Sequence, residues 1–309
     1  MPDDKNGRWV TINGTHIFIK DGQTVEEAFA EFEGKRTKTA DAIISKIKYA
    51  DAQYWYYDKN DKRIMPKKWF TEKLTKALKQ HPIRDADIEE AISVAMNNKV
   101  GFFVLQDHGV SDFNSDEKRI RINMDNVFAQ CVEVMCHEIG HAMDNDGGNK
   151  WLSSTFVSPT HGKTMVDMLR EELSAPGMID MLTDEWARLV DLRRQVTSAW
   201  AEKSISKEEY LYKYTAYNEA QGDLCDVIQM MWGNQEAIKR CGYLAHPSSD
   251  YAGHNADRHR RLQGTELFAE LTASKATDDE TRFYGIMDLY CPKTVEIYKE
   301  IIEEVKRNG

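Results

Sequence analysis

The feature that most constrains this chain is the motif His137-Glu138-Ile139-Gly140-His141, which lies in an apolar stretch predicted to be helical. The predicted helix runs from Asn126 to Asn145 and ends at the turn Asp146-Gly147-Gly148. Residues four apart lie about 40° apart around a helix, so both imidazoles face one side and can bind one metal ion. Glu138 lies beside them, where its carboxylate can take a proton from a metal-bound water. The motif therefore predicts a catalytic metal site.

A zinc ion in such a site needs a third protein ligand, with water in the fourth position. Residues 142–147 contain no histidine, so this ligand lies farther along the chain. The best candidate is Glu266, because Glu266 and Glu270 lie four apart on one face of a second predicted helix, residues 266–275. One carboxylate would bind the metal, and the other would hold a ligand histidine through its second ring nitrogen. Four later histidines in loop-like stretches stay alternative third ligands: His161, His246, His254 and His259.

Composition and charge narrow the class of protein. The chain is 41% hydrophobic and 30% charged, as a soluble globular protein is, and no apolar run approaches the ~20 residues of a membrane span. The N-terminus is polar, so we expect neither a secretory signal nor a membrane partner. The net charge of -10 argues against nucleic acid as a partner. Five cysteines without a C-x-x-C pair indicate free thiols in a reducing compartment.

The pattern along the chain predicts an α+β, helix-rich fold with a small mixed sheet and an N-terminal β-hairpin. Strands at 9–12 and 15–19 flank Asn13-Gly14, and a capping box opens a helix at Thr24 that ends before a linker at Gly34–Arg36. We therefore expect an appendage over 1–36 and one main domain over 37–309. In that domain the pattern predicts strands at 100–106 and 118–124, helices at 177–203 and 206–232, a loop over 242–262 and a final helix at 294–305.

The motif and the segments that follow it resemble those of a known protein family. HEIGHAMD, followed by ELFAE and by Tyr290–Thr294 (YCPKT), resembles the anthrax lethal factor-type zinc metallopeptidase domain, a zincin with glutamate as third ligand (a gluzincin). The resemblance covers roughly residues 95–300. It implies a zincin-like fold, Zn²⁺ on His137, His141 and Glu266, Glu138 as general base, and Glu270 as the carboxylate that supports a ligand.

A second, shorter resemblance concerns the N-terminus. Residues Arg8–Gln23 are similar to a short β element of phage minor head proteins. Together with the first, this resemblance implies a prophage-encoded protein of a bacterium, located in the bacterial cytoplasm or in the phage virion. Phage capsid or head proteins then become expected partners.

The sequence departs from the metallopeptidase group at two places. Family members carry a tyrosine several residues before the third ligand, where its hydroxyl stabilises the oxyanion, whereas residues 257–261 here read DRHRR. His259 or Arg258 could donate a hydrogen bond instead, or Tyr251 could reach in from the preceding loop. The other departure is a long helical insert at about 150–240, which would form a lid, an extra layer or a partner surface.

These observations lead to one main hypothesis and two alternatives. The main hypothesis is a zinc-dependent metalloendopeptidase that hydrolyses a peptide bond in a protein or peptide substrate, with zinc-activated water and Glu138 as general base. The strand at 118–124 would pair with the substrate backbone. One alternative is a head-associated structural phage protein with a structural or vestigial zinc site; the missing tyrosine favours it and the intact Glu138 opposes it. The other is a toxin or effector protease that uses the same site.

Overall fold

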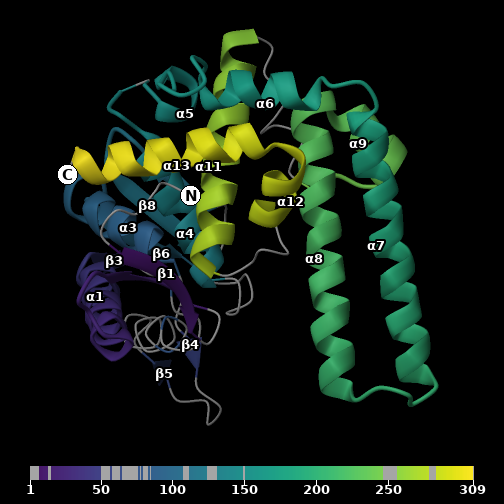
Figure 1. Cartoon of the computed structure of the whole chain (residues 1–309), viewed down its shortest axis with the longest axis horizontal. Coiled ribbons are helices and arrows are strands. Elements are labelled where there is room, and N and C mark those ends of the chain that lie inside the picture. Colours follow the sequence, from purple (N-terminus) through teal and green to yellow (C-terminus); the bar gives the residue numbers. More distant parts are fainter. Residues whose placement is uncertain are drawn as a thin grey trace. The chain divides into compact units, whose positions relative to one another are not determined.

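The computed structural model is helix-rich with a small mixed sheet, so the predicted α+β class is confirmed (Figure 1). It describes residues 7–12, 15–49, 56–57, 63–64, 76, 78, 83, 85–106, 111–123, 131–148, 150–245, 256–277 and 283–308. The chain divides into two compact units: unit 1 comprises 1–150, 268–278 and 301–309, and unit 2 comprises 151–267 and 279–300. None of the helices in these described ranges combines the length and apolar character needed to cross a bilayer. The division into an appendage over 1–36 and a domain over 37–309 stays a prediction.

Unit 1 contains a four-stranded sheet in the order β3-β6-β8-β7. Its strands are β3 (Ile47–Tyr49), β6 (Phe102–Gln106), β7 (Asp112–Asn114) and β8 (Arg119–Asn123). The first three in sheet order are parallel, and β7 runs antiparallel to β8. Ile120 and Ile122 are buried while their neighbours on β8 are half-buried, as the alternation predicts.

The predicted role of β8 as an exposed edge is wrong. β8 pairs with β6 along its whole length, and β7 covers its other side from Arg119 to Arg121. Within the described sheet, most of β8 is therefore an inner strand. Among the described strands, β7 is the one that ends the sheet on this side. The sequence did not indicate β7, because three residues are too few to display an alternation.

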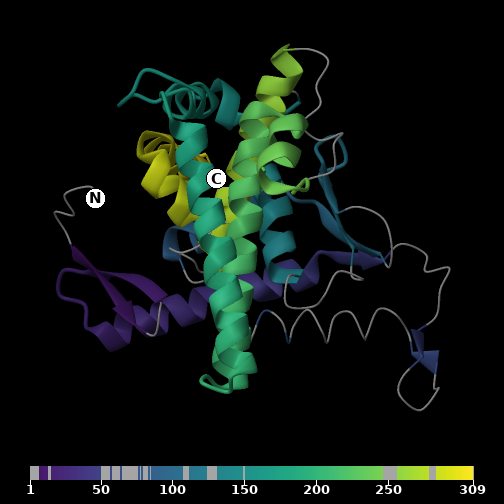
Figure 2. The same ribbon diagram turned by 90° about the vertical axis from the view of Figure 1, so that its right-hand side faces the viewer.

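The N-terminal hairpin forms as predicted from β1 (Gly7–Ile12) and β2 (Thr15–Lys20), with Ile12 opposite Thr15; the turn at 13–14 lies outside the described residues. Thr24 and Glu27 make the predicted capping box of α1 (Val25–Ser45). Figure 2 shows hairpin and helix together.

The linker predicted at 34–36 is wrong, because α1 continues through it. Thr39 and Ile43 are buried, and their packing outweighs the roughly 1 kcal/mol that a glycine costs inside a helix.

Two further helices of unit 1 pack together, α3 (Ala86–Asn98) and α4 (Cys131–Asp144). Asp85 caps α3, and its side chain accepts from the backbone N–H groups of Asp87 and Ile88. Lys99 lies just beyond α3, and its Nζ donates to the carbonyl oxygens of Met143 and Asn145 at 2.9 Å each. This lysine therefore satisfies carbonyls at the C-terminal end of α4. Unit 1 also holds the short antiparallel pair β4 (Tyr56–Tyr57) and β5 (Arg63–Ile64).

Unit 2 is helical in its described part. Its shorter helices are α5 (Leu152–Thr155), α6 (Met165–Leu173), α9 (Asn234–Cys241) and α12 (Phe283–Tyr290). The two long helices predicted in the insert are α7 (Met178–Ala201) and α8 (Lys207–Trp232), which lie side by side as a helical hairpin in both views (Figures 1 and 2). Stacked rings of Trp200 and Tyr210, 4.6 Å apart, hold its tip.

Two helices contribute to both units, α11 (Ala256–Thr277) and α13 (Pro292–Arg307). In unit 2, the Glu172 carboxylate accepts hydrogen bonds from the backbone N–H groups of Lys293 and Thr294 at the start of α13. The loop predicted over 242–262 is wrong from residue 256 onward, because α11 begins there. Its first turns are rich in arginine and carry no apolar period, so the sequence did not indicate a helix.

Candidate metal centre

The helix α4 presents both histidines of the motif on one side. The ring centroids of His137 and His141 lie 4.7 Å apart, with their planes at 87°. The opposite side of α4 is apolar and buried, with Met135, Ile139 and Met143 all in the core. Burial of that side fixes the rotation of α4, and the histidines consequently face the other way.

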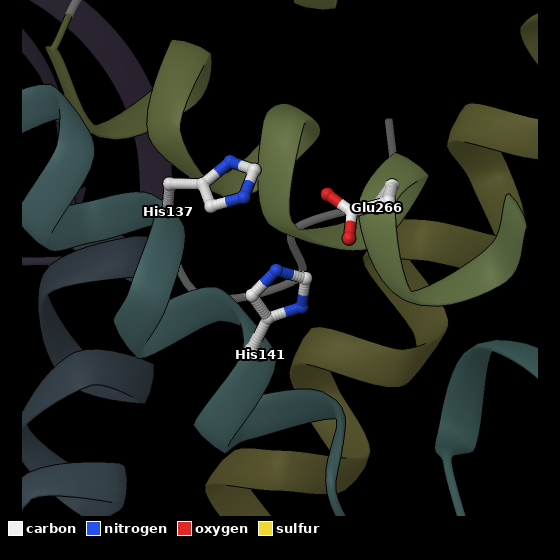
Figure 3. Close-up of side chains that lie close together, drawn as sticks. All are labelled: His137, His141 and Glu266. Atoms are coloured by element: carbon white, nitrogen blue, oxygen red, sulfur yellow. The ribbon is translucent and has the colours of Figure 1, made fainter. Parts of the chain in front are cut away.

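The third member of the site, Glu266, comes from α11. One ligand atom from each of His137, His141 and Glu266 lies within 4.8 Å of the other two. Figure 3 shows the Glu266 carboxylate directed toward the two imidazole rings. Ligand atoms around a tetrahedral zinc lie about 3.4 Å apart, so closing onto an ion requires shifts of about 1.4 Å or less. Two imidazoles and one carboxylate are also a donor set that zinc accepts.

Glu270 lies one turn after Glu266 on α11, on the same face. Its Oε1 is 3.1 Å from Nδ1 of His137, within unit 1. A carboxylate accepts here, so Nδ1 of His137 carries the hydrogen and Nε2 is the nitrogen left for a metal. Because α11 is one continuous helix, this contact also sets the position of Glu266, four residues earlier.

A close approach of α4 and α11 makes this arrangement possible. A Cβ placed on Gly140 would lie 2.8 Å from the Cα of Ala269 and 3.1 Å from the Cβ of Thr272. No side chain fits between the helices at this point, so the glycine of the motif allows the two backbones to come together. Sequence reasoning missed this role of Gly140. The available signal was a glycine in the middle of a helix, where it is unfavourable unless packing requires it.

Glu138 lies between the two histidines in sequence and is 5% exposed. The negative charge of Glu138 affects the pKa of Arg121 on β8. The pKa of Arg121 is raised, chiefly by its hydrogen bond to Asp112 of β7, and the charge of Glu138 adds to that rise. The carboxylate of the predicted general base is therefore near enough to act on a side chain of β8, which contacts α4, as β7 does.

The N-terminal half of α11 is held within unit 2 by polar side chains. Gln263 Oε1 accepts from Nε and Nη2 of Arg170 on α6, at 2.8 and 2.6 Å. Its Nε2 donates to the carbonyl of Met230 on α8 at 2.7 Å. Arg260 binds Asp167 of α6 through both Nε and Nη2. These contacts fix the stretch of helix directly before Glu266.

The other predicted site residues are placed as follows. His259 lies on α11, seven residues before Glu266, with its Nε2 3.1 Å from Nε2 of Gln263. Arg258 is exposed. His161 is bound to Glu296, Nε2 to Oε2 at 2.7 Å, and does not belong to the group around His137. Tyr251, His246 and His254 lie outside the described residues.

Comparison with known proteins adds no identification, since no protein-family model, curated protein sequence or solved structure matches this chain.

Proposed function

We propose that this protein is a zinc-dependent metallopeptidase of the zincin type, which hydrolyses peptide bonds in protein or peptide substrates. The observation that carries the proposal is the group of His137, His141 and Glu266 with the buried carboxylate of Glu138 on the same helix. A purely structural zinc site has four protein ligands, whereas the described residues bring three together here, as in a catalytic site whose fourth position holds water.

Each residue of the group has a distinct task in this proposal. His137, His141 and Glu266 would hold the ion, and Glu270 would keep His137 in the tautomer that binds through Nε2. A bound Zn²⁺ supplies Lewis acidity, which polarises a carbonyl and makes a water molecule more acidic. Glu138 takes the proton from the attacking water and delivers it to the nitrogen of the leaving amine.

The substrate backbone would pair with β7. This strand is antiparallel to β8, ends the described sheet on its side and contacts α4. Unpaired backbone groups at a sheet edge bind extended peptides by adding a strand. The expected substrate edge is thus Asp112–Asn114 of β7 and not β8, which lies between β6 and β7 in the described sheet.

A rival proposal is a head-associated phage protein in which a metal only ties α4 to α11. One observation favours it: residues 256–265 of α11 contain no tyrosine to stabilise an oxyanion. Losing one such donor typically costs about 10²–10³-fold in rate. A toxin or effector protease would use the same chemistry as the main proposal and differ only in substrate.

The experiment compares the zinc-loaded protein with Glu138→Gln. Unfolded protein substrates and a peptide library are incubated with each, and cleavage is followed by mass spectrometry. We expect cleavage by the parent and a loss of about 10²–10⁴-fold in the variant, with zinc content and melting temperature unchanged. Glu208→Gln, an exposed carboxylate of α8, serves as the matched control and should cleave normally. Equal cleavage by Glu138→Gln, or none by the loaded parent, would support the rival.

A further inference from the structure

The side-chain amide of Gln263 is 2% exposed and lies three residues before Glu266 on α11. Three of its contacts define its orientation without ambiguity. A guanidinium can only donate, so the two bonds from Arg170 identify Oε1; a backbone carbonyl can only accept, so the bond to Met230 identifies the NH₂ group. The side of the amide that faces His259 is therefore a donor.

This orientation determines the tautomer of His259. Nε2 of Gln263 and Nε2 of His259 lie 3.1 Å apart, and the glutamine nitrogen carries hydrogens. The histidine nitrogen must then accept, which requires it to be unprotonated. In a neutral imidazole the single hydrogen is consequently on Nδ1. The opposite tautomer would place two N–H groups against each other in a partly buried position.

We propose that Gln263 is a positioning residue, which holds the His259 ring with Nε2 as an acceptor and its hydrogen on Nδ1. The tautomer follows from the contacts alone, whereas its catalytic use rests on the proposed function. His259 precedes Glu266 by seven residues, two helical turns, and so lies on the same face of α11. In the proposed peptidase, the Nδ1–H of His259 would donate to the oxyanion in place of the missing tyrosine.

The presence of glutamine, and not glutamate, at position 263 supports a positioning role over a merely structural one. A glutamate at this position would pair more strongly with Arg170, because the hydrogen bonds would join opposite charges. It would, however, present only acceptors to the Met230 carbonyl and to His259. The neutral amide gives up part of the attraction to Arg170 and gains a donor on the side of the histidine.

The test measures the tautomer directly. Long-range ¹H–¹⁵N NMR spectra of ¹⁵N-labelled, zinc-loaded protein distinguish a protonated Nδ1 from a protonated Nε2, and His259→Gln identifies the signals of His259 by their loss. We expect the hydrogen on Nδ1 in the parent. In Gln263→Glu it should move to Nε2, where it can donate to the new carboxylate. His161, which bonds to Glu296 elsewhere in unit 2, should keep its signals in both proteins.

Activity supplies a second readout. Gln263→Glu should lower kcat by up to about 10²-fold with little change in KM, and adding His259→Gln to it should cause no further loss. A parent with its hydrogen on Nε2, or a Gln263→Glu variant that keeps it on Nδ1, would overturn the inference. If that variant does not fold, the tautomer of the parent decides alone. A parent that cleaves no peptide would instead contradict the proposed function, and the NMR result would still stand.

Discussion

The two halves of α11 are held in different ways, although they belong to one helix. Residues 268–277, in unit 1, pack against α4 at a contact that leaves no room for a side chain, between Gly140 and Ala269. Residues 256–267, in unit 2, are held by the polar bonds of Arg260 and Gln263. Glu266 lies at the end of the polar half, one turn from the tight contact.

The difference between the two halves of α11 indicates how the residues of the proposed site are positioned. A contact between backbones tolerates almost no added atom, so it fixes the distance between the helices. Hydrogen bonds between long side chains adjust more easily but define which group faces which. We infer that the tight half sets the spacing of α4 and α11, while the polar half sets the rotation of the helix before Glu266.

The largest effect should come from Gly140→Ala. The new Cβ would meet the backbone of Ala269, so α11 must move, and we expect a loss of about 2–3 kcal/mol in unfolding free energy together with weaker zinc binding. Gly222→Ala is the matched control, because that helical glycine of α8 has no atom within 4 Å of the added Cβ. The control should be stabilised by up to about 1 kcal/mol. Denaturant unfolding and zinc titration measure both quantities.

Gly264→Ala tests the other half of the helix with the same change. Its Cβ would meet the Ser153 hydroxyl at 2.9 Å and the Ser153 Cβ at 3.3 Å. Both are side-chain atoms that need to shift by only a few tenths of an ångström, whereas at Gly140 the nearest atom belongs to the backbone. We expect a smaller loss than for Gly140→Ala, about 1 kcal/mol in unfolding free energy. If Gly264→Ala costs as much as Gly140→Ala, the distinction between a tight half and an adjustable half is wrong.

The next prediction concerns zinc affinity and the carboxylate of Glu270, which contacts Nδ1 of His137. Glu270→Leu removes the acceptor of the Nδ1 hydrogen, and zinc affinity should fall about 10–100-fold. Glu270→Gln keeps an acceptor oxygen and should lose less. Zinc competition with a chromophoric chelator gives both affinities. An unchanged affinity in Glu270→Leu would show that the contact does not orient a metal ligand.

Arg170→Met should have a moderate effect on stability. It leaves the buried Oε1 of Gln263 without its two donors, at a cost of about 1–2 kcal/mol in unfolding free energy. Arg188→Met is the control, since its pairing with Glu185 is an exposed contact within one helix and should contribute less than about 0.5 kcal/mol. Equal losses in urea unfolding would contradict a special role for the polar half.

The smallest expected effect is a dependence of the unfolding free energy on pH in acid. The hydrogen bond from Arg260, followed by one from Thr164, lowers the pKa of Asp167 below its ordinary 3.8. The folded-state pKa is depressed, so the stabilisation is present above about pH 3.8 and is lost as the pH falls through the folded-state value. Asp167 is 44% exposed, which limits the effect to about 1 kcal/mol or less. The stability difference between the parent and Arg260→Gln should therefore be constant above pH 5 and shrink in stronger acid.

Elements with a strong local pattern were predictable from the sequence. The motif helix, the strand around Ile120 and Ile122, the N-terminal hairpin and the two long helices of the insert each repeat apolar residues at their own period or carry a turn signal. The placing of Glu266 and Glu270 on one face also followed from their spacing. These inferences needed only neighbours along the chain.

Contacts between distant segments were not predictable. Arg170 and Gln263 are 93 residues apart, and nothing local indicates that they meet. The start of α11 escaped detection because polar bonds, not an apolar stripe, hold its arginine-rich turns. The partner of Gly140 likewise becomes visible only when α4 and α11 are placed together. The strand order also required the structure, and it moved the proposed substrate edge from β8 to β7.

The most direct test of the account is the metal content of the purified protein and of Glu266→Ala. Both are prepared without a metal-affinity tag, supplied with zinc, passed over a desalting column and measured by elemental analysis. We predict about one zinc per chain in the parent and a clear loss in the variant, since His137 and His141 would be the ligands left of the group found among the described residues. Zinc retained in full by Glu266→Ala, or no zinc in the parent, would contradict the proposed site.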